Sequence, residues 1–324
     1  MKAVRAVELT GPAGLRIEEA VAPVAGPDEI TVTVKATALN RADLLQTRGL
    51  YPAPAGIVQD IPGLEYSGEV ASVGSRVTRW KIGDRVMGLV GGGAWAQTVV
   101  THEREAIRVP AGVTLEHAAA IPEAFSTAFD ALVTQGGMTV GSQVLVHAVA
   151  SGVGTAAVQL GKLYGARVIG TARTASKLDR VALGEDAILT SGPTFAEQVK
   201  SLTGGRGVDL VLDLVGGDFV PESVRALASK GTLLLVGLVA GASVDLPLAL
   251  VLQKRLRIQG TALRSRPLEE KIAVAQAIGA RLMPGFASGA LTPVIDSVLP
   301  MTDIVKGLER MAANENYGKI VLTW

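Results

Sequence analysis

The stretch VHAVASGVGTAAVQL, residues 146–160, begins as an apolar run, turns at two glycines and continues with a helical pattern. Strand, glycine turn and amphipathic helix are the context in which a dinucleotide-binding turn is found. Gly152 and Gly154 lack a Cβ, so the backbone can approach a pyrophosphate at the helix N-terminus. The usual fingerprint has a third glycine, and here Ser151 stands in its place. For this stretch taken alone, a tight turn without a ligand is the alternative.

The segments from residue 123 onward alternate between strand and helix. Runs that are apolar on both faces are typical of parallel strands with helices on each side. This alternation favours a dinucleotide site over a bare turn, and it predicts an α/β fold with a doubly wound parallel sheet of the Rossmann type. The six runs are SQVLVHAV, ARVIGTA, DAILT, VDLVLDLV, GTLLLVG and RLRIQGT.

Residues 1–122 are predicted to be mostly β structure. EITVTVKATAL, residues 29–39, alternates apolar and polar side chains as a half-buried strand does. Closely spaced short strands punctuated by Gly and Pro follow, which favours a small barrel or sandwich. After the alternating region at 123–265, a helix, a strand, a second helix and the last strand GKIVLTW fill residues 266–324.

Composition limits the function classes that are open to the chain. Its 324 residues, 48% hydrophobic with a formal charge of +1, are enough for two domains and give no electrostatic signature of nucleic acid or an anionic membrane. There is no cysteine and there are three widely spaced histidines, so disulfides, a cysteine nucleophile and a zinc site are not expected.

One segment, GTLLLVGLVAGASVDLPLALVL at 231–252, is apolar enough to suggest a membrane span. Asp245 and Pro247 lie in its second half, so a buried strand, a glycine turn and a short helix explain it better. The N-terminus lacks the apolar core of a signal peptide. We therefore expect a soluble cytoplasmic protein with no membrane and no nucleic-acid partner.

The second strand of the alternating region bears on which dinucleotide binds. An NAD site usually carries Asp or Glu about 20 residues past the first glycine position, where it binds the ribose hydroxyls. Here GTARTASK places Ala172 there, with Arg173 beside it and Lys177 one turn further on. Two cations without a carboxylate suit a 2′-phosphate, which predicts NADPH rather than NADH. The alternative is that both are solvated surface charges.

Seven stretches of the chain together resemble zinc-independent medium-chain dehydrogenases/reductases, specifically quinone oxidoreductases of the zeta-crystallin type. Within that group the p53-inducible quinone oxidoreductase branch is the most similar, and the likeness spans nearly the whole chain. The stretches are ALNRADLLQTRGLYP (38–52), PGLEYSGEV (62–70), WKIGDRVMGL (80–89), AAAIPEAFSTAF (118–129), HAVASGVGTAAVQL (147–160), ALRSRP (262–267) and YGKIVL (317–322).

The resemblance implies a GroES-like catalytic domain made of residues 1–122 with 266–324, a Rossmann NADP-binding domain at 123–265, and a cleft between them. It also implies a homodimer joined through the edge strands of the Rossmann sheets. In zinc-dependent relatives a catalytic Cys precedes the element that reads NRAD here, and a ligand His sits in a Gly-His-Glu triplet. This chain has Asn40 and Leu64 at those positions, so we expect no metal.

Without a metal, reduction requires an acceptor that takes a hydride readily, and the resemblance implies an NADPH-dependent quinone reductase. Relatives of this branch can yield semiquinones by one-electron transfer, and the same outcome is expected here. The alternatives are a zinc-free NADPH-dependent enoyl-thioester reductase and an NADPH-binding protein with an RNA-binding or structural, crystallin-like role. A small-molecule substrate is expected for the quinone reductase and for the enoyl-thioester reductase.

The resemblance also implies the site residues, with Asn40, Tyr51 and Ser151 as the catalytic set. Tyr51 is expected to hydrogen-bond a quinone oxygen and not to supply a proton, because a phenol has a pKa near about 10; packing of a loop tip is the alternative. Ser151 is expected to contact cofactor or substrate, the alternative being a harmless glycine replacement. His147 is interpreted as a packed core imidazole and not as a catalytic acid.

The predicted cofactor contacts lie at the ends of the Rossmann strands and in four segments outside them. One departure concerns Ser191, which stands where many family members have a Tyr near the adenosine phosphate, so adenine-side contacts are expected to be looser. The predicted contacts are Asn40, Thr127, Ser151, Gly152, Val153, Gly154, Arg173, Lys177, Val215, Gly216, Gly237, Leu238, Leu263, Ser265, Asn316 and Lys319.

Overall fold

The computed structural model describes residues 1–324, and the chain divides into two compact units. The first unit contains Met1–Ser126 and Leu263–Trp324, and the second contains Thr127–Ala262. The sequence placed the first boundary between residues 122 and 123. Helix α3 (Pro122–Phe129) contains the boundary found here, and because the helix is continuous, no change in the sequence pattern marks it.

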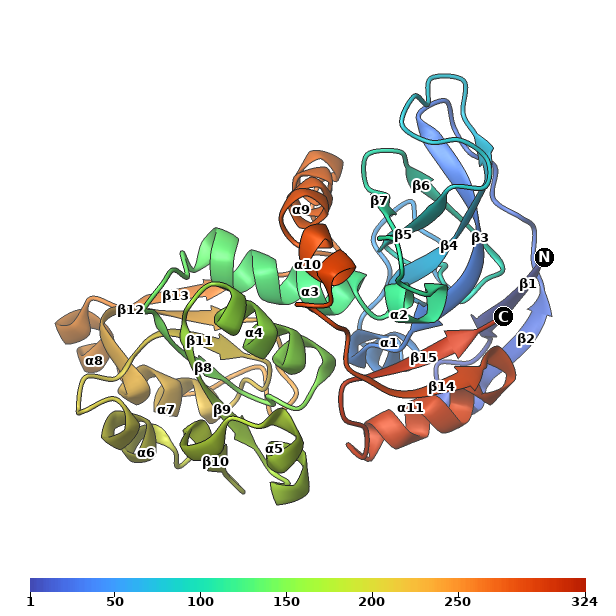
Figure 1. Cartoon of the computed structure of the whole chain (residues 1–324). Helices are drawn as coiled ribbons and strands as arrows, with labels where there is room; N and C mark the ends of the chain where they lie inside the picture. Colours follow the sequence, from blue (N-terminus) through green and yellow to red (C-terminus); the bar gives the residue numbers. More distant parts are fainter. The chain divides into compact units, whose positions relative to one another are not determined.

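The second unit is built on a six-stranded parallel sheet with the order β10-β9-β8-β11-β12-β13 (Figure 1). In chain order this is 3-2-1-4-5-6, the doubly wound arrangement of Rossmann folds. The predicted fold class is confirmed, and each apolar run of the sequence is one strand. The strands are β8 (Gln143–Val146), β9 (Arg167–Ala172), β10 (Ala187–Leu189), β11 (Val208–Asp213), β12 (Leu227–Leu235) and β13 (Arg257–Gly260).

Helices follow the strands of this sheet. Helix α4 is the amphipathic helix that the sequence predicts after the glycine turn, and it buries Ala156, Ala157 and Leu160. On the sheet, α6 and α7 share one buried cluster with Leu145 and Ile169 of the strands. The helices are α4 (Gly152–Leu163), α5 (Ala175–Val181), α6 (Ala196–Leu202), α7 (Phe219–Ala226) and α8 (Leu248–Lys254), preceded by a π-helical segment at Asp130–Gln135.

The apolar segment 231–252 forms the end of β12, a loop and most of the short helix α8. None of the residues of α8 is buried. The interpretation of this segment as strand, turn and helix is confirmed. No helix of the structure combines the length and the apolar character that a membrane crossing requires.

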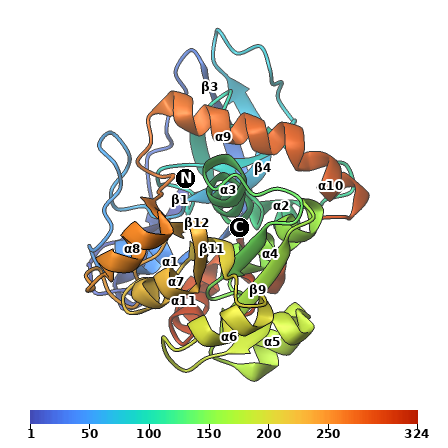
Figure 2. The same ribbon diagram turned by 90° about the vertical axis from the view of Figure 1, so that its left-hand side faces the viewer.

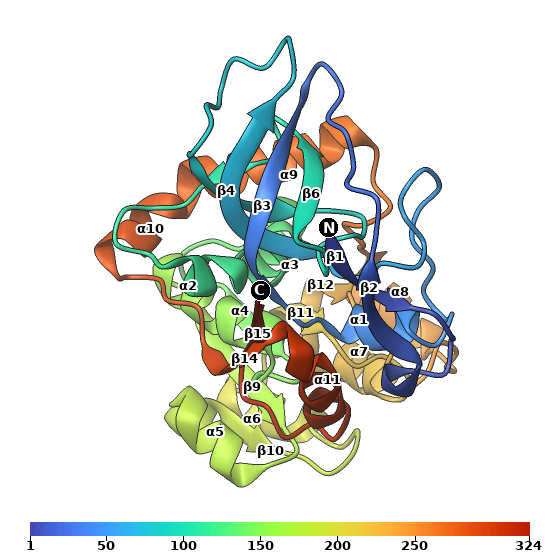
Figure 3. The same cartoon turned by 90° about the vertical axis from the view of Figure 1, so that its right-hand side faces the viewer.

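The first unit contains a seven-stranded sheet in which β14-β15-β3-β4-β5-β7 run in order and β6 pairs with β3. Figure 3 shows β3, β4 and β6 side by side. In β3 the alternation predicted from the sequence buries Ile30, Val32 and Val34. The strands are β3 (Glu29–Ala38), β4 (Glu65–Val73), β5 (Arg85–Leu89), β6 (Thr98–His102), β7 (Ile107–Arg108), β14 (Ile295–Pro300) and β15 (Lys319–Thr323), with β1 (Lys2–Ala6) and β2 (Leu15–Glu19) paired separately.

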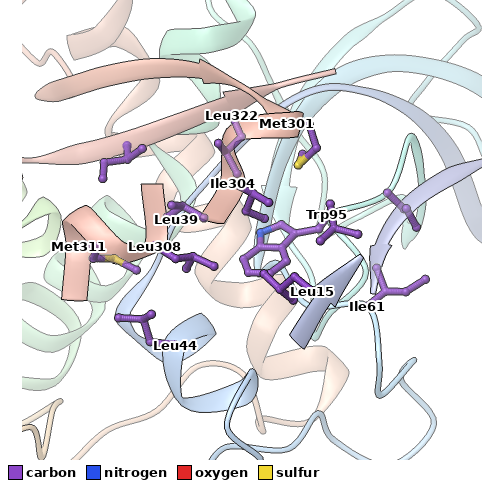
Figure 4. Close-up of a cluster of buried hydrophobic side chains, with 14 residues drawn as sticks. Leu15, Leu39, Leu44, Ile61, Trp95, Met301, Ile304, Leu308, Met311 and Leu322 are labelled. Carbon is purple, nitrogen blue, oxygen red and sulfur yellow. The ribbon is translucent and has the colours of Figure 1, made fainter. Parts of the chain in front are cut away.

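The C-terminal segment completes this sheet and its core. Strand β15 pairs antiparallel with β3, with Val321 opposite Ala38, so the residues just beyond the pairing, Lys319 and Asn40, approach each other. Helix α11 (Ile304–Ala312) packs its apolar face into a buried cluster around Trp95 (Figure 4). The N-terminal and C-terminal parts of the chain therefore share one core.

Four further helices in this unit complete the fold. The sequence predicts one helix over 267–283, whereas the structure has α9 (Leu268–Arg281) followed by α10 (Met283–Ser288) (Figure 2). Pro284 explains the break, because it lacks the N–H that would continue α9. The others are α1 (Arg41–Gln46) and α2 (Leu115–Ala119).

Candidate active site

The glycine turn of the second unit leads directly into α4. Gly154 must be glycine, since a Cβ there would lie 2.5 Å from the Val149 carbonyl oxygen. The turn also holds Ala148 at φ 49°, in the left-handed region that side chains other than glycine rarely adopt. The N–H groups of Gly152 and Val153 make no hydrogen bond within the chain. Two donors at the positive end of a helix therefore remain for an anionic ligand.

Ser151 is the N-cap of α4. Its Oγ accepts a hydrogen bond from the Gly154 N–H at 3.1 Å, which satisfies one of the donors at the helix start. An N-cap of this kind stabilises a helix by about 1 kcal/mol relative to alanine. Relative to glycine the gain is only a few tenths of a kcal/mol, so the alternative of a harmless glycine replacement stays open. Its hydroxyl hydrogen is still able to donate, and a contact from it to cofactor or substrate stays a prediction.

The residues that are predicted to bind a 2′-phosphate follow β9. Ala172 ends the strand and is buried, Arg173 is exposed, and Lys177 is half-buried in the first turn of α5. Because β10 lies next to β9 at the edge of the sheet and runs parallel to it, Ser191 lies at the same end of the sheet, and its side chain is exposed. These residues occupy the end of the sheet where Rossmann folds bind the adenosine half of a dinucleotide.

Four predicted contacts come together after β11 and β12. A Cβ on Gly216, whose φ is 72°, would lie 2.9 Å from both the Gly237 oxygen and the Leu238 Cα. The Val215 oxygen accepts from the Ala240 N–H at 2.8 Å. The two loops thus lie against each other at the carboxyl edge of the sheet. The turn after β8 lies at the same edge, since β8 and β11 are parallel neighbours.

His147 is held inside the second unit. Its Nδ1 lies 2.9 Å from Thr171 Oγ1 and its Nε2 2.9 Å from Ser223 Oγ, with Phe195 and Phe219 against the ring. Burial lowers the pKa of the imidazole to about 3. A neutral ring with both nitrogens bound cannot exchange protons with a substrate near neutral pH, so the interpretation as a packed core residue is confirmed.

Asp213 at the end of β11 shapes the loop that follows it. One carboxylate oxygen accepts from the N–H groups of Val215 and Gly216 at 2.8 and 2.9 Å. The other oxygen is buried without a hydrogen-bond partner, and burial raises the pKa of the carboxyl. The side chain therefore fixes the backbone of two predicted contacts.

In the first unit, Asn40 lies in a buried polar network where β3 and β15 end. The Lys319 ammonium donates to Asn40 Oδ1 at 2.5 Å and to the Leu39 oxygen at 2.9 Å, and it lies 2.7 Å from Glu65 Oε1. The Asn40 amide nitrogen donates to Glu65 Oε1 at 2.9 Å and to the Ala38 oxygen at 3.1 Å. All three hydrogens of the Lys319 ammonium therefore have acceptors inside this unit, and its predicted contact with the cofactor stays a prediction.

Two carboxyl groups, Glu65 within this network and Asp43 beside it, also bind backbone N–H groups. Glu65 Oε2 accepts from the Glu123 N–H at the start of α3, at 2.8 Å. Asp43 Oδ2 accepts from the Asn40 N–H at 2.7 Å, while its Oδ1 is buried without a partner. Burial raises the pKa of Asp43 to about 7, against the opposing effect of the Lys319 charge.

Tyr51 is held by Arg264. The guanidinium lies 5.0 Å from the centre of the Tyr51 ring. It donates to the main-chain carbonyl oxygens of Tyr51 and Gly91 at 3.1 and 2.7 Å, and to Gln46 Oε1 at 2.7 Å. Burial raises the pKa of the Tyr51 phenol above its usual value near 10. The phenol therefore stays protonated and can donate a hydrogen bond, which agrees with the expectation that it does not act as an acid.

A pocket beside Arg264 lies entirely within the first unit. Glu105 and Lys271 form an ion pair at 3.2 Å on its wall, and burial raises the pKa of Glu105. The rest of the wall is mostly apolar. Its aliphatic lining comes from Leu64, Leu89, Val90, Ile107, Leu263, Val274 and Ala275.

The remaining predicted contacts belong to different segments of the two units. Leu263 is half-buried on the wall of this pocket, whereas Ser265 is exposed. Asn316 donates to the Gly318 oxygen at 2.8 Å in the first unit. Thr127 is nearly buried on α3 and belongs to the second unit. Their roles toward a cofactor stay predictions.

Sequence reasoning missed four residues that organise these regions: Asp43, Glu65, Asp213 and Arg264. Each stands in a segment that was singled out for another reason. The available signal was a charged residue within or directly beside an apolar strand, as in GLEY and VLDLV, because such a charge is buried and requires partners. Which partners it finds depends on the tertiary structure.

Two protein-family models match the chain. An alcohol dehydrogenase GroES-like domain matches residues 26–111, and a domain described as a zinc-binding dehydrogenase matches residues 152–280. Quinone oxidoreductase-like protein 2 of Bos taurus is 30% identical over 335 residues, which cover 99% of this chain and 92% of that protein. The chain belongs to the medium-chain dehydrogenase/reductase superfamily. The resemblance predicted from the sequence is confirmed at this level, including its quinone oxidoreductase-like members.

A further relative of this medium-chain dehydrogenase/reductase is much longer. Erythronolide synthase EryA2 of Saccharopolyspora erythraea is 41% identical over 212 residues, and the matched region is 64% of this chain but 6% of the synthase. The similarity therefore concerns one small part of that protein. No group of three or more His, Asp and Glu side chains in the structure is arranged to hold a metal ion.

Solved structures share the fold over essentially the full chain. A Pseudomonas syringae quinone oxidoreductase superimposes with a TM-score of 0.89 at 29% identity, covering 100% of this chain and 99% of that one. An NAD-dependent alcohol dehydrogenase gives 0.86 at 30% identity and full coverage of both chains. The CurK enoyl reductase gives 0.86 at 27% identity, covering 99% and 98%. The chain is thus similar in fold to proteins named for three different reactions, and the one coenzyme named among them is NAD.

Proposed function

We propose that this medium-chain dehydrogenase/reductase is an NADPH-dependent quinone reductase. The observation that carries the proposal is the polar centre at Asn40. Where zinc-dependent relatives have metal-ligating Cys and His, this chain has an amide clamped by an ammonium and a carboxylate, and an aliphatic Leu64. Such groups do not form the Cys and His set that polarises an alcohol or ketone through zinc. An acceptor that takes a hydride without that help, such as a quinone, suits this centre.

The second unit fits the pyridine nucleotide. The unpaired N–H groups of Gly152 and Val153 at the start of α4 would bind its pyrophosphate, and the space left by the missing Cβ of Gly154 lets the turn pack tightly. Arg173 and Lys177 would bind a 2′-phosphate. When bound, the nucleotide supplies the hydride, and the protein supplies orientation and exclusion of water.

The first unit supplies the groups proposed to bind the acceptor. Tyr51 would donate a hydrogen bond to a quinone oxygen as negative charge develops there. Arg264 holds the ring and backbone of Tyr51 in place, and three of its five N–H groups already have acceptors in the protein. Protons would come from solvent, because the raised pKa of Tyr51 makes the phenol a poor acid.

An enoyl-thioester reductase is the second candidate, supported by the similarity to the CurK enoyl reductase. A thioester carried on a phosphopantetheine would need free cationic side chains for its phosphate. Arg264, the cation that stacks on Tyr51, is half-buried and already directs three of its five N–H groups at acceptors of the protein, so it is only partly available to a phosphate. This favours the quinone.

A homodimer is proposed as the working form. All four residues of the edge strand β13 are exposed, so its outer backbone groups lie open to another strand. Leu248 and Leu252 of α8 are 69% and 79% exposed. Light scattering on the purified protein tests this: a mass twice the 33.4 kDa of the chain supports the dimer, and a monomer refutes it.

Two measurements test the proposed reaction. Stopped-flow oxidation of NADPH with ortho-quinones, para-quinones and an enoyl-CoA should show turnover with quinones, and rapid turnover of the enoyl-CoA alone would replace quinone by thioester. Arg173→Ala with Lys177→Ala should weaken NADPH binding roughly tenfold or more and leave NADH unchanged. Lys162→Ala, which removes an exposed cation from the last turn of α4, is the matched control.

A further inference from the structure

A second pocket lies entirely within the second unit, at the opposite edge of the sheet from the glycine turn. Its wall comes from the segments that lead into β11, β12 and β13, three neighbouring parallel strands. These strands end at the edge where the turn after β8 lies, so the pocket is at the amino edge. It encloses about 420 Å³, a volume typical of small-molecule sites. We call it the basic pocket, because its wall contains no acidic side chain and four cations: Lys200, Arg206, Arg225 and Lys254.

Two arginines of the basic pocket keep most of their hydrogen-bond donors unused. Arg206 is paired with Asp209 and Arg225 with Glu222, each three residues away. A guanidinium has five N–H groups, and the pairs use two of them on Arg206 and one on Arg225. Three N–H groups on Arg206 and four on Arg225 therefore remain for a ligand, and the two side chains are 51% and 49% exposed.

Lys254 has a different part in the basic pocket. Its ammonium donates to the main-chain oxygens of Val224, Arg225 and Leu227 at 3.3, 2.9 and 2.7 Å, which uses all three of its hydrogens. These carbonyls lie at the end of α7, where the helix dipole is negative. The ammonium therefore offsets the one nearby group that would repel an anion. Burial and the charge of Lys200 lower the pKa of Lys254, so like charges converge here and an anion would stabilise them.

Helix ends alone do not account for this cluster of cations. Lys200 and Arg225 stand in the last turns of α6 and α7, where a cation complements the negative end of the helix. Arg206 stands in the loop between α6 and β11 and has no such role. Nor do helix ends explain why the carboxylates that pair with these cations stay off the pocket wall.

We propose that the basic pocket binds a small polyanion, a molecule that carries two or more phosphate or carboxylate groups. A guanidinium fork matches both groups in geometry, and Arg206 and Arg225 would each hold one of them. Ser229 adds a hydroxyl, and Leu227 and Leu250 form the apolar part of the wall. This site does not depend on the proposed function, since it lies at the other edge of the sheet.

The site is also compatible with the proposed dimer. Leu250 and Lys254, which line the basic pocket, lie one turn apart on α8. Leu248 and Leu252, which are exposed, lie on the opposite face of the same helix, because two residues of an α-helix differ by about 200° around its axis. A ligand in the basic pocket therefore leaves that face free.

Methyl NMR of the whole chain reads the basic pocket directly, because Leu227 and Leu250 line it. Titration with diphosphate or with citrate should shift both leucines with a dissociation constant below about 1 mM, and the tighter probe identifies the anionic group as phosphate or carboxylate. Inorganic phosphate, with one such group, should bind roughly tenfold more weakly. Binding at the glycine turn would be seen separately, at Leu238 beside Gly216 on the carboxyl edge.

A double variant and a matched control test which cations bind. Arg206→Gln with Arg225→Gln should weaken the binding of the tighter probe roughly tenfold or more. The ion pairs that it removes are partly exposed and contribute little stability, so the variant should stay folded, which thermal unfolding checks. Lys162→Gln with Arg180→Gln removes the same charge from exposed positions of α4 and α5 and should leave the affinity unchanged.

Three results would overturn the proposal. One is that no probe shifts Leu227 and Leu250 with a dissociation constant below about 1 mM. Another is an equal loss of affinity in the double variant and its control, because binding would then follow the net charge of the unit. The third is that inorganic phosphate binds as tightly as diphosphate and citrate, because a single anionic group would then suffice.

Discussion

The carboxyl of Asp43 should make the first unit less stable as pH rises through the range from about 4 to 7. Burial raises its pKa from 3.8 to about 7, chiefly because one oxygen has no partner and the carboxyl is fully enclosed. Below pH 3.8 the group is protonated in folded and unfolded chains alike. Between these values it ionises only when unfolded, so the stability contributed by the protonated form is lost as pH rises. One pKa unit is worth about 1.4 kcal/mol, which makes the full effect about 4 kcal/mol.

Asp43→Asn isolates this contribution. Asparagine keeps an oxygen for the Asn40 N–H and cannot ionise, so its advantage in unfolding free energy over wild type should grow by about 3 kcal/mol from pH 4.5 to pH 7.5. Urea unfolding followed by tryptophan fluorescence measures it, because Trp80, Trp95 and Trp324 all lie in the first unit. A difference that stays constant across this range would show that the carboxyl ionises normally and would refute the reasoning.

A matched control has the opposite sign. The hydrogen bond from Arg108 lowers the pKa of Asp84, so the ionised carboxylate stabilises the folded chain at neutral pH and this contribution is lost as pH falls through its folded-state pKa. The unfolding free energy of Asp84→Asn, taken relative to wild type, should therefore fall as pH rises. If both variants gave the same trend, the measured slope would come from another group.

Three further predictions concern the site. Ser151→Ala should lower the unfolding free energy of the second unit by about 1 kcal/mol and Ser151→Gly by a few tenths, measured by urea unfolding with circular dichroism; equal losses would contradict the cap. Tyr51→Phe should lower kcat with quinones roughly tenfold while leaving the pH profile between 6 and 9 unchanged, because the phenol stays protonated there; a shifted profile would make it an acid. His147→Phe should lower the unfolding free energy by roughly 2 to 4 kcal/mol, because the hydroxyls of Thr171 and Ser223 lose their hydrogen-bond partner. A folded variant of unchanged stability would refute the structural role of His147.

The local sequence of the second unit predicted most of its structure. Each apolar run became a strand and the glycine turn led into α4, because a parallel sheet covered on both faces requires side chains that are apolar throughout. The contacts that the family resemblance implies at Val215, Gly216, Gly237 and Leu238 lie with the glycine turn at one edge of the sheet, since parallel strands end on the same side. The local sequence could not indicate that Ala148 adopts a left-handed conformation or that Ser151 caps the helix, because both depend on the exact path of the backbone through the turn.

The first unit shows where sequence reasoning ends. The chain carries Asn40, Glu65 and Lys319 far apart, and residue types alone do not pair them. Only the antiparallel pairing of β15 with β3 sets Lys319 against Asn40, and the pairing of β3 with β4 brings Glu65 to the same place. Local pattern decides which segments become strands and helices, because propensity and burial act within a few residues. Which buried charge meets which partner is decided by contacts between distant segments, where the cost of an unpaired charge selects one arrangement.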